Sequence, residues 1–521
     1  MSLKKGSLGG MIVAVTAFCF AGCSESSFSF VSSDGDLNLD GDTETDLSEQ
    51  TPSDGDDDLI PLPDGDVIGE KSEEETDAEE EAQSETEEDW DPPSPPGLEG
   101  LRLSAFSGHN IAIRWAPLVG DGTVIVERYN DDAGDWDKIA QRPAAAGRFL
   151  DLALTPETPY RYRLTLCDDG CREPLVTETV STPPTTLPPM TVNVHEAEAA
   201  DDLVLFGAVT TYEDVTSASH VAAVDKNGVV WWEFTGSEGG AITEVQPLDD
   251  RTLAIGQYMT FVRLDLDGRE LFRYGGALAH HDIDPVSDGR FIYLTFDEFE
   301  TQPGYIVSGD GIEILGADGR TVEWSWLARD HIPLSDYNLI DINTQPFGLG
   351  HDWTHANALT YDETENKVYI NVRNLDRIYK IDVATGGVDW IMGDGGDFGE
   401  GLWAHSHNPH FFFPENRFLL FDNGFQRGDF SMYSRVIEVV FDPEAKTAEI
   451  VWEYREDPDF YSFALGSVEQ KLDGTILVDD GLNGRLFEIS REKRKLWELK
   501  LGTGYVIYKG VSVDKTFFTE W

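Results

Sequence analysis

The stretch Asp225-Lys226-Asn227-Gly228-Val229-Val230-Trp231-Trp232 is a tight turn followed by a strand of β-branched and aromatic residues. A turn that leads into an aromatic strand returns five more times towards the C-terminus, and each has the character of a β-hairpin. The later aromatic positions are Phe272, Trp324, Trp390, Trp452 and Trp497. Spacings of roughly 40 to 65 residues are typical of four-stranded propeller blades joined by loops of variable length.

A second turn lies inside each repeat and leads into an apolar strand. Its examples are Asp288-Gly289, Asn366-Lys367, Asn416-Arg417 and Asp473-Gly474. No helical period of any length appears in this region. Residues 190–521 are therefore predicted to form a six-bladed β-propeller, and the fold class is all-β.

Residues 97–187 contain short alternating strands separated by turn signals, which predicts a β-sandwich. Trp115 ends one alternating strand, and the segment 154–164 is similar to the tyrosine-corner strand of fibronectin type III domains. That resemblance implies a spacer or docking module without chemistry of its own. Cys167 and Cys171 flank a turn, and in an exported chain they are predicted to form a local disulfide. A metal site is the weaker alternative, because nothing nearby completes it.

The N-terminus resembles a bacterial lipoprotein signal. Lys4 and Lys5 precede the apolar run 11–20, which is too short to span a bilayer as a helix. Small residues then lead to Cys23, so residues 1–22 are expected to be removed and Cys23 to be lipidated. An ordinary cleaved signal is the alternative. Ser24 favours anchoring in the outer membrane, with the folded part facing the periplasm or the cell surface.

Residues 23–96 are rich in Asp, Glu, Ser and Pro and poor in apolar residues, which predicts a disordered acidic tether. The run from Asp36 begins like a calcium loop, but Leu47 stands where a bidentate Glu is needed. A solvated linker is therefore the better interpretation. The whole chain has 38 Lys and Arg against 98 Asp and Glu, a net charge of −60, which argues against nucleic-acid partners.

The 11 histidines gather in a few places. His281, His355 and His407 each precede the inner turn of a repeat, so they are expected on the innermost strands of neighbouring blades, at one end of the central channel. Arg373 ends the next strand of one blade, and Asp422-Asn423 end that of the following blade. Such a convergence predicts an anion site or a metal site rather than three buried structural histidines.

These motifs resemble the bacterial arylsulfate sulfotransferases. The similar segments are Trp353-Thr354-His355-Ala356-Asn357, Arg373, His407 with Phe421-Asp422-Asn423-Gly424, and the earlier His280-His281-Asp282. The resemblance covers roughly residues 190–521. It implies a six-bladed propeller that moves a sulfuryl group from one phenolic ester to another phenol, with no nucleotide sulfate donor and no cofactor.

The resemblance also implies roles for individual residues. His407 would be the nucleophile that forms a sulfohistidine, which suits a neutral imidazole. His355, Asn357 and Arg373 would bind the sulfate oxygens, since a guanidinium offers planar paired donors. His281 would act on the phenol proton. His280, Asp422, Asn423 and Trp353 are further predicted substrate-binding residues, and Trp403 and Phe412 are candidates to stack on a phenol.

The choice within each histidine group stays open at this stage. His405 and His410 flank His407, and His280 flanks His281. Two other functions also fit the sequence. Three or more histidines at one end of a propeller could hold iron or zinc, although Arg373 counts against a nearby cation, so no metal is predicted. A non-catalytic surface propeller for binding or adhesion would suit the fibronectin-like domain and the tether. The main prediction is a lipid-anchored sulfotransferase with small phenolic partners.

Overall fold

The structure is a computed structural model that describes residues 98–210, 219–236, 242–257, 259–345 and 350–521. The predicted signal segment, the lipidated Cys23 and the acidic tether lie outside the described residues, so these predictions remain untested. No helix in the described ranges is long and apolar enough to cross a membrane.

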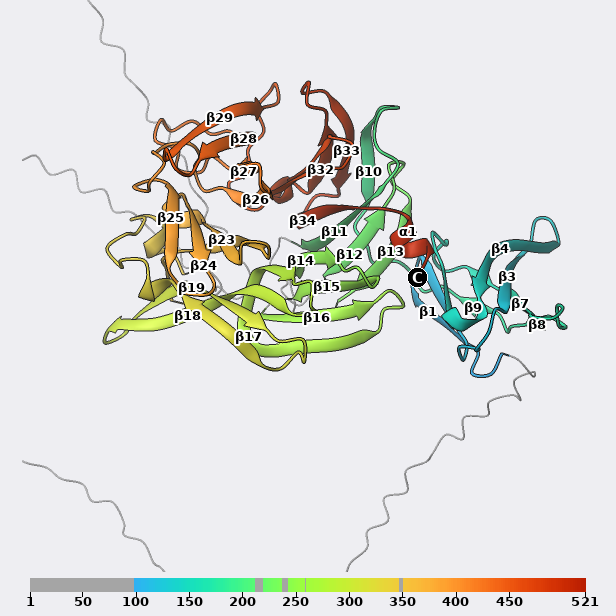
Figure 1. Cartoon of the computed structure of the whole chain (residues 1–521). Helices are drawn as coiled ribbons and strands as arrows, with labels where there is room; N and C mark the ends of the chain where they lie inside the picture. Colours follow the sequence, from blue (N-terminus) through green and yellow to red (C-terminus); the bar gives the residue numbers. More distant parts are fainter. Residues whose placement is uncertain (1–97, 211–218, 237–241, 258, 346–349) are drawn as a thin grey trace, which may run out of the picture. The chain divides into compact units, whose positions relative to one another are not determined.

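The first described part, up to residue 181, consists of two main β-sheets around one core (Figure 1). One sheet has the order β1 (Arg102–Ser107), β2 (Asn110–Arg114), β5 (Arg148–Asp151). The other has the order β4 (Asp135–Pro143), β3 (Thr123–Asn130), β7 (Tyr162–Cys167), β8 (Leu175–Val176). A two-stranded sheet joins β6 (Pro159–Tyr160) to β9 (Val180–Ser181), and η1 spans Ala144–Ala146.

Alternating residues of both sheets fill this core, including the buried Trp115 and Tyr162. The Tyr160 hydroxyl accepts a hydrogen bond from the Thr155 N–H at 2.8 Å, which ties the strand to the chain just before it. Cys167 and Cys171 form a disulfide. These features fit a β-sandwich, while its assignment to the fibronectin type III class stays a prediction.

The remaining described chain is built from four-stranded antiparallel units. The first unit has the order β13 (Val230–Thr235), β12 (His220–Val224), β11 (Leu203–Thr210), β34 (Tyr505–Val513). The next eight strands form one continuous sheet of β14 (Ile242–Pro247), β15 (Thr252–Gln257), β16 (Met259–Asp265), β17 (Glu270–Pro285), β18 (Phe291–Gln302), β19 (Tyr305–Leu315) and β20 (Val322–Leu327), with the short β21 (His351–Asp352) parallel to β19. Strand β17 serves two units, because its first half pairs with β16 and its second half with β18.

Three further units follow. They are β22 (Ala356–Asp362), β23 (Lys367–Val372), β24 (Arg377–Asp382), β25 (Val388–Gly393); then β26 (His407–Phe412), β27 (Arg417–Asp422), β28 (Arg435–Asp442), β29 (Thr447–Tyr454); and last β30 (Ser467–Gln470), β31 (Ile476–Asp480), β32 (Arg485–Ile489), β33 (Lys495–Leu501) with β10 (Met190–His195) outside β33. Short helical turns lie between strands: η2 (Ala328–Asp330), η3 (Asp341–Asn343), η5 (Arg373–Leu375) and η6 (Gly481–Asn483). The short helix α1 (Thr516–Thr519) follows the last strand.

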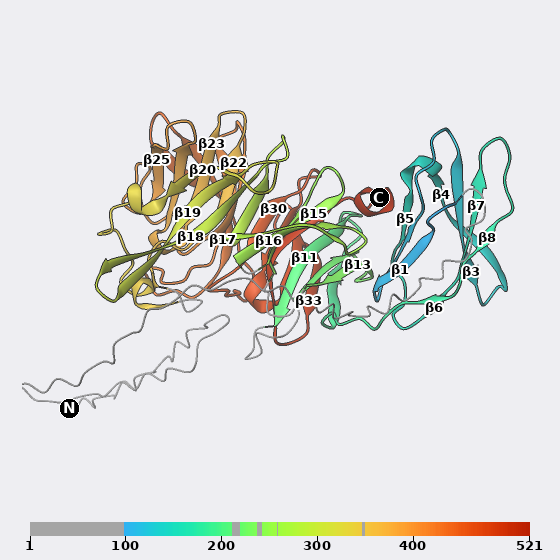
Figure 2. The ribbon, with the colours of Figure 1, turned by 90° about the horizontal axis from the view of Figure 1, so that it is seen from below.

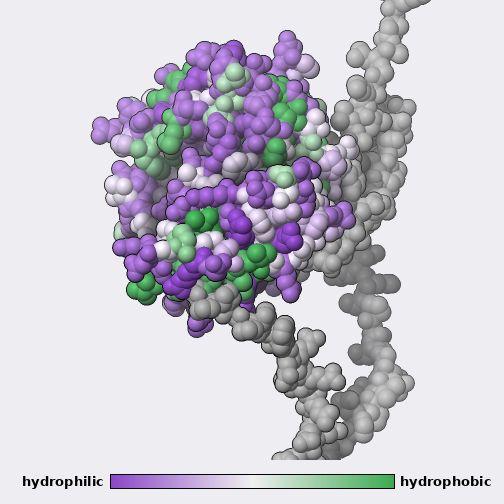
Figure 3. Space-filling model, turned by 90° about the vertical axis from the view of Figure 1, so that its right-hand side faces the viewer, coloured by the Kyte–Doolittle hydropathy of each residue, from purple (hydrophilic) through white to green (hydrophobic). Residues whose placement is uncertain are grey.

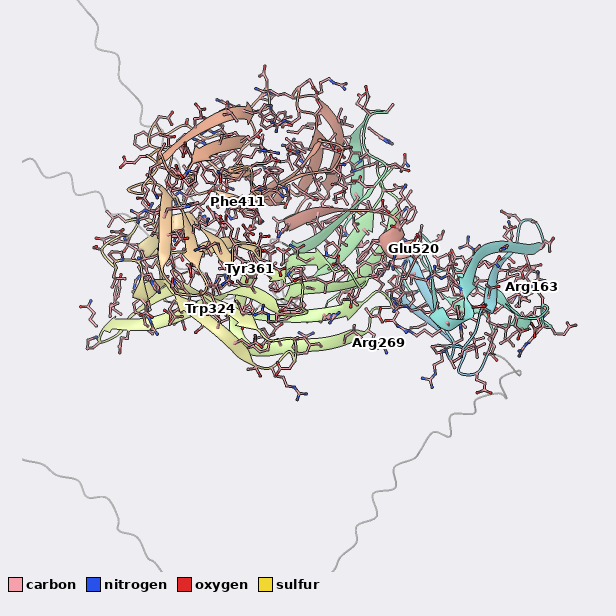
Figure 4. The ribbon with its side chains drawn as sticks, viewed as in Figure 1. Arg163, Arg269, Trp324, Tyr361, Phe411 and Glu520 are labelled. Carbon is pink, nitrogen blue, oxygen red and sulfur yellow. A yellow bond between two sulfur atoms is a disulfide. The ribbon has the colours of Figure 1, made fainter. Side chains whose placement is uncertain are left out.

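The inner strands of the units contact one another in a closed cycle. Strand β14 contacts β17, and the cycle continues through β22, β26, β30 and β34 back to β14. Strands β14, β26 and β34 lie around the centre of the ring in Figure 1, and Figure 2 shows the same sheets from below. In Figure 4, Tyr361 of β22 and Phe411 of β26 lie near this centre, while Arg269 lies farther out. The described chain is therefore all-β and propeller-like.

The repeated aromatic positions of the sequence all lie on the fourth strand of a unit, counted outward from its inner strand. They are Trp232 on β13, Phe272 on β17, Trp324 on β20, Trp390 on β25, Trp452 on β29 and Trp497 on β33. The repeated turns are hairpins, as expected from the sequence. Most of the surface in Figure 3 is hydrophilic, with small separate apolar areas, which agrees with the high charge of the chain.

Candidate active site

Left-handed backbone marks the entry to four consecutive inner strands. His281, His355, His405 and Leu465 have φ values of 53°, 50°, 52° and 60°. Positive φ is uncommon for residues other than glycine, and it concentrates where the surrounding structure fixes a side chain for function. The four residues lie in or just before β17, β22, β26 and β30. The backbone thus aims side chains from neighbouring units at one end of the ring.

The predicted register of the histidines was wrong in one respect. His405, not His407, takes the left-handed position that His355 occupies, and both precede the Asn of the inner turn by 11 residues. His407 stands two residues later, where the previous unit has Asn357. The Asn423 position matches Arg373 in the same way, since each follows the second strand of its unit.

Asn423 fixes the tautomer of His407. The Asn423 Nδ2 donates to the carbonyl oxygens of Ser462 and Leu465, both at 2.7 Å, so its Oδ1 is the atom that faces His407. This oxygen lies 2.7 Å from His407 Nδ1 and accepts its hydrogen. The Nε2 atom therefore carries the lone pair, and the Leu465 N–H donates to it at 3.2 Å. The proton position follows from the hydrogen-bond network.

His407 is neutral near pH 7. Burial lowers its pKa well below the usual value of 6.5, and the nearby positive charge of Arg373 lowers it further, against the opposite effect of the Asn423 hydrogen bond. The side chain is only 5% exposed. A neutral imidazole with a defined Nε2 lone pair can attack an electrophile without a separate base.

His281 is the second neutral imidazole. Its ring lies 5.2 Å from the ring of His355 and 5.0 Å from that of His280. Burial lowers its pKa well below 6.5, and the charges of His280, His355, His407 and Arg373 act in the same direction. His280 is turned differently, because its ring stacks on Phe296 at 4.0 Å and its Nε2 lies 3.2 Å from Asp310.

His355 is oriented by a carboxylate. Its Nδ1 lies 2.8 Å from Asp352 Oδ2, so the ring donates from Nδ1 and leaves Nε2 for other partners. Burial tends to raise the pKa of Asp352, but His355 and the hydrogen bond from it outweigh burial and leave this pKa lowered. Asp352 therefore stays ionised and stabilises positive charge on the ring, as an orienting carboxylate does in a catalytic triad.

Arg373 brings the positive charge of the site. Its Nη1 donates to Asn374 at 2.7 Å, and its Nε is buried without a hydrogen-bond acceptor among the described residues. The residue keeps only 8% of its surface exposed. A buried polar group without a partner calls for an explanation, and an oxyanion ligand supplies one.

His405 is held as a structural partner. Its Nε2 lies 2.9 Å from Asp341 Oδ2, its Nδ1 lies 3.7 Å from Asp376, and the residue is 1% exposed. Burial lowers the pKa of His405, and Arg373 adds to this effect. Asp341 also accepts from Gln426, so the loop around η3 is fastened over the site. His405 lies against two carboxylates, whereas the His407 nitrogens lie against a neutral amide oxygen and a backbone N–H.

Asn357 supports the backbone next to His407. Its Nδ2 donates to the Ser406 carbonyl oxygen at 2.9 Å, and its Oδ1 accepts from Asn371 at 2.7 Å. Asn371 also donates to the same Ser406 oxygen at 2.8 Å. The structure therefore places Asn357 beneath the turn that carries His407, with its amide engaged inside the protein.

Two predicted substrate contacts do not fit the structure. Trp353 is fully buried, with Nε1 donating to the Asp336 carbonyl oxygen at 2.7 Å, so it cannot stack on a substrate. Asp422 is also fully buried, and its oxygens accept from the Ala404 N–H at 2.9 Å and from Arg435 at 2.6 Å. Trp353 is a core residue and Asp422 is a structural ion-pair partner.

Other aromatic candidates behave differently. Trp403 belongs to a buried core cluster, and Phe412 lies under Arg417 at 3.6 Å. The partly exposed rings at the site are instead Phe425, 5.2 Å from His405 and 5.8 Å from Arg373, and Phe463, 5.9 Å from Phe425. Neither ring could be predicted as a site residue from the sequence, because aromatic residues occur throughout the repeats.

Comparison with known proteins agrees with this picture of an all-β chain with a histidine–arginine site. Residues 189–509 match the family Arylsulfotransferase (ASST). The chain belongs to this family, and membership indicates sulfuryl transfer with small-molecule donor and acceptor. No curated protein matches the chain. Among described residues, no group of three or more His, Cys, Asp or Glu is arranged to hold a metal ion.

Solved structures are similar at low identity. A protein of unknown function from Bacteroides caccae is 11% identical, with a TM-score of 0.39, over 60% of this chain and 99% of that one. The β-propeller domain of Myceliophteria thermophila Cps50 (Swd1) is 10% identical, with a TM-score of 0.35, over 61% and 90%. A streptogramin B lyase is 11% identical, with a TM-score of 0.34, over 60% and 88%. Scores this low carry no argument about function.

Proposed function

We propose that the chain is an exported, lipid-anchored sulfotransferase that moves a sulfuryl group from an aryl sulfate ester to a phenol without a nucleotide donor. The reaction passes through a sulfohistidine at His407 in a ping-pong sequence. In this proposal the units described above are the blades of a six-bladed propeller, preceded by a fibronectin type III-like sandwich. The closed cycle of inner strands and the six aromatic fourth strands support the blade count.

In the first half-reaction the Leu465 N–H releases His407 Nε2, and the freed lone pair attacks the sulfur of the ester. A nitrogen–sulfur bond forms and the sulfur–oxygen bond to the phenolate breaks. Arg373 donates to the sulfuryl oxygens, where negative charge must be held, and His355 adds an Nε2–H when its ring carries a second proton opposite Asp352. Asn423 accepts from Nδ1 and so stabilises the positive charge that attack places on the ring.

In the second half-reaction an acceptor phenol attacks the sulfur of the sulfohistidine, and the nitrogen–sulfur bond breaks. His281 is neutral and takes the phenolic proton. The proton gained in one turnover is passed to the leaving phenolate of the next. The overall exchange is balanced, since one phenol is released for each phenol that is sulfated.

One observation carries this proposal: His407 is a buried neutral imidazole with its tautomer fixed by Asn423, close enough to Arg373 for the guanidinium to lower its pKa. A metal ligand would not need the arginine, because a cation repels a cation. A passive binding surface would need neither the tautomer nor the buried arginine.

The test uses the full chain with p-nitrophenyl sulfate. Without acceptor we expect a burst of about one equivalent of p-nitrophenol, the kinetic sign of a covalent intermediate. Added phenol should restore turnover. Mass spectrometry should then find one added SO₃ group on the peptide that contains His407.

The control is His195→Ala, which removes an exposed imidazole on the outer strand β10 and should leave the burst intact. His407→Ala should abolish it. Absence of p-nitrophenol release by the wild-type protein, or an unchanged burst in His407→Ala, would refute the proposed function. Stoichiometric zinc or iron in the purified protein would favour the metal alternative instead.

A further inference from the structure

A buried lysine joins three inner strands of the ring next to the candidate site. Lys509 comes from β34, and its Nζ lies 2.9 Å from Glu244 Oε1 on β14 and 3.2 Å from Asp282 Oδ1 on β17. The side chains of Lys509, Glu244 and Asp282 are 14%, 1% and 3% exposed. The reaction proposed above assigns this lysine no role.

Asp282 connects the lysine to the site. It directly follows His281, and its Oδ2 accepts from the Leu359 N–H of β22 at 2.8 Å. Its Oδ1 accepts from the Ile283 N–H at 3.1 Å and faces Lys509. The carboxylate is thus held from β34 on one side and from β22 on the other. A residue held at both oxygens restrains the left-handed turn of His281 that comes immediately before it.

The cluster has one cation among several acids. Burial opposes the charge of Lys509, but the attraction of Asp282 and Glu244 prevails and raises the lysine pKa, so the ammonium stays charged. Burial and the charge of Asp282 raise the pKa of Asp284 to about 7, and burial raises that of Glu244 well above its usual value. Lys509 is therefore the group that balances the negative charge beside His281.

Other groups face the two ends of this arrangement. Burial, together with the charge of Lys509, lowers the pKa of His410 on β26 to about 4. Glu469 on β30 is affected as well: burial raises its pKa to about 7, while Lys471 and Lys509 oppose the rise. On the site side, His281 is surrounded by His280, His355, His407 and Arg373. Asp282 with its lysine lies between these two groups of charges.

We propose that Lys509 is a positioning residue for sulfuryl transfer: it holds and neutralises Asp282, and so keeps His281 aimed at His355 and uncharged for accepting the phenol proton. This proposal rests on the proposed function. The contacts behind the role of Lys509 do not depend on that function, because Lys509 touches Asp282 and Asp282 follows His281 directly in the chain.

The test compares Lys509→Met with Lys509→Arg in the full chain. Loss of the lysine leaves the Asp282 carboxylate without its counter-charge, which favours a protonated His281. We expect the acid limb of the acceptor half-reaction to move to higher pH by about one unit, so that the rate at a given pH on that limb falls about tenfold. Lys509→Arg keeps the charge and should retain the wild-type profile.

Lys226→Met is the matched control, since it removes another buried lysine that pairs with Glu488 away from the site. Its stability should fall, but its pH profile should stay that of the wild type. If Lys509→Met folds and keeps the wild-type profile, or if Lys509→Arg shifts it as far as Lys509→Met does, the proposal is wrong.

A direct titration separates this proposal from the proposed function. Nuclear magnetic resonance of the histidine rings should show a higher pKa for His281 in Lys509→Met than in the wild type, whether or not the protein transfers sulfate. Asp282→Asn removes the negative charge and should lower the His281 pKa, which provides a second variant of opposite sign if Lys509→Met does not fold. A His281 pKa that is unchanged in every folded variant overturns the positioning role.

Discussion

Removing the Asn423 side chain tests the tautomer argument most directly. In Asn423→Ala the His407 Nδ1 loses the acceptor that lies 2.7 Å away, and the imidazole is free to place its proton on Nε2. The attack on sulfur makes the ring positive, so the lost hydrogen bond is one to a charged group. Such bonds contribute about 1.5–3 kcal/mol. This energy corresponds to a roughly 10- to 150-fold slower sulfurylation of His407.

The assay is the burst of p-nitrophenol in stopped flow, with urea unfolding measured in parallel. Loss of the hydrogen bonds to the carbonyl oxygens of Ser462 and Leu465 should cost about 1–3 kcal/mol of stability, although Ser462 keeps a bond from the Ser434 hydroxyl. Asn423→Asp keeps an acceptor for Nδ1 but directs a carboxylate at those two carbonyls. It should therefore be less stable than Asn423→Ala and yet sulfurylate faster.

Asn193→Ala is the control, because the Asn193 side-chain amide also donates a hydrogen bond, in this case to the Glu498 carboxylate at 2.9 Å, but the residue lies on the outer strand β10. Its burst rate should equal that of the wild type. A burst in Asn423→Ala within about twofold of the wild-type rate would be too small for a lost charged hydrogen bond and would refute the tautomer argument.

Three further outcomes follow from the same structure. Arg373→Lys should slow the burst about tenfold or more, since an ammonium cannot offer paired planar donors to the sulfuryl oxygens. Burst rates measured over a range of donor concentrations check this. Lys226→Met should cost about 1–3 kcal/mol in urea unfolding, because the buried Glu488 loses one of its two lysine partners and keeps Lys471. Lys446→Met removes a side chain that is 38% exposed and should cost under about 1 kcal/mol. The free energy of unfolding should also fall as the pH drops below 6.5, because the unfolded chain then protonates histidines that the folded chain keeps neutral. The fall should continue until the pH passes the folded-state pKa, which is about 4 for His410. Urea midpoints measured from pH 8 to 4 test the sign.

The sequence predicted the hairpins well because their signals are local. A turn such as Asp225–Gly228 and the aromatic strand after it specify a hairpin without any distant residue. The aromatic positions therefore fell on the fourth strand of each repeated unit, counted from the inner strand. The seam between β11 and β34 could not be predicted in this way, since these strands are separated by nearly the whole ring.

The register of the histidines needed more than the distance to the next turn. A bulge lies between Ala356 and Ala358 in β22, and another between His407 and His410 in β26. A bulge inserts a residue and turns side chains to the other face, so counting from the turn does not settle orientation. The equal 11-residue spacing of His355 and His405 was visible in the sequence, but it marks a shared backbone turn and not a shared role.

Complete burial is the reason why Trp353 and Asp422, both predicted to bind substrate, do not reach the site. Trp353 lies so close to Gly309 that a Cβ there would stand 3.0 Å from the ring, and Phe299 closes it from another side. Both partners come from the β18–β19 hairpin, about 50 residues earlier in the chain. Asp422 is surrounded by arginines that follow it, and nothing in the motif itself separates an ion-pair carboxylate from a ligand-binding one.

The imidazoles of the site lower one another's pKa, and this has a consequence for substrate binding. His281 and His407 are neutral partly because Arg373 already carries a positive charge beside them. A sulfate ester placed on Arg373 brings the opposite charge and favours protonation of the histidines near it. The empty site thus keeps the nucleophile ready, and the bound anion helps His281 to keep the proton that a leaving phenolate needs. An uncharged aromatic ligand would give no such assistance, so the same residues that permit the attack also select for an anionic donor.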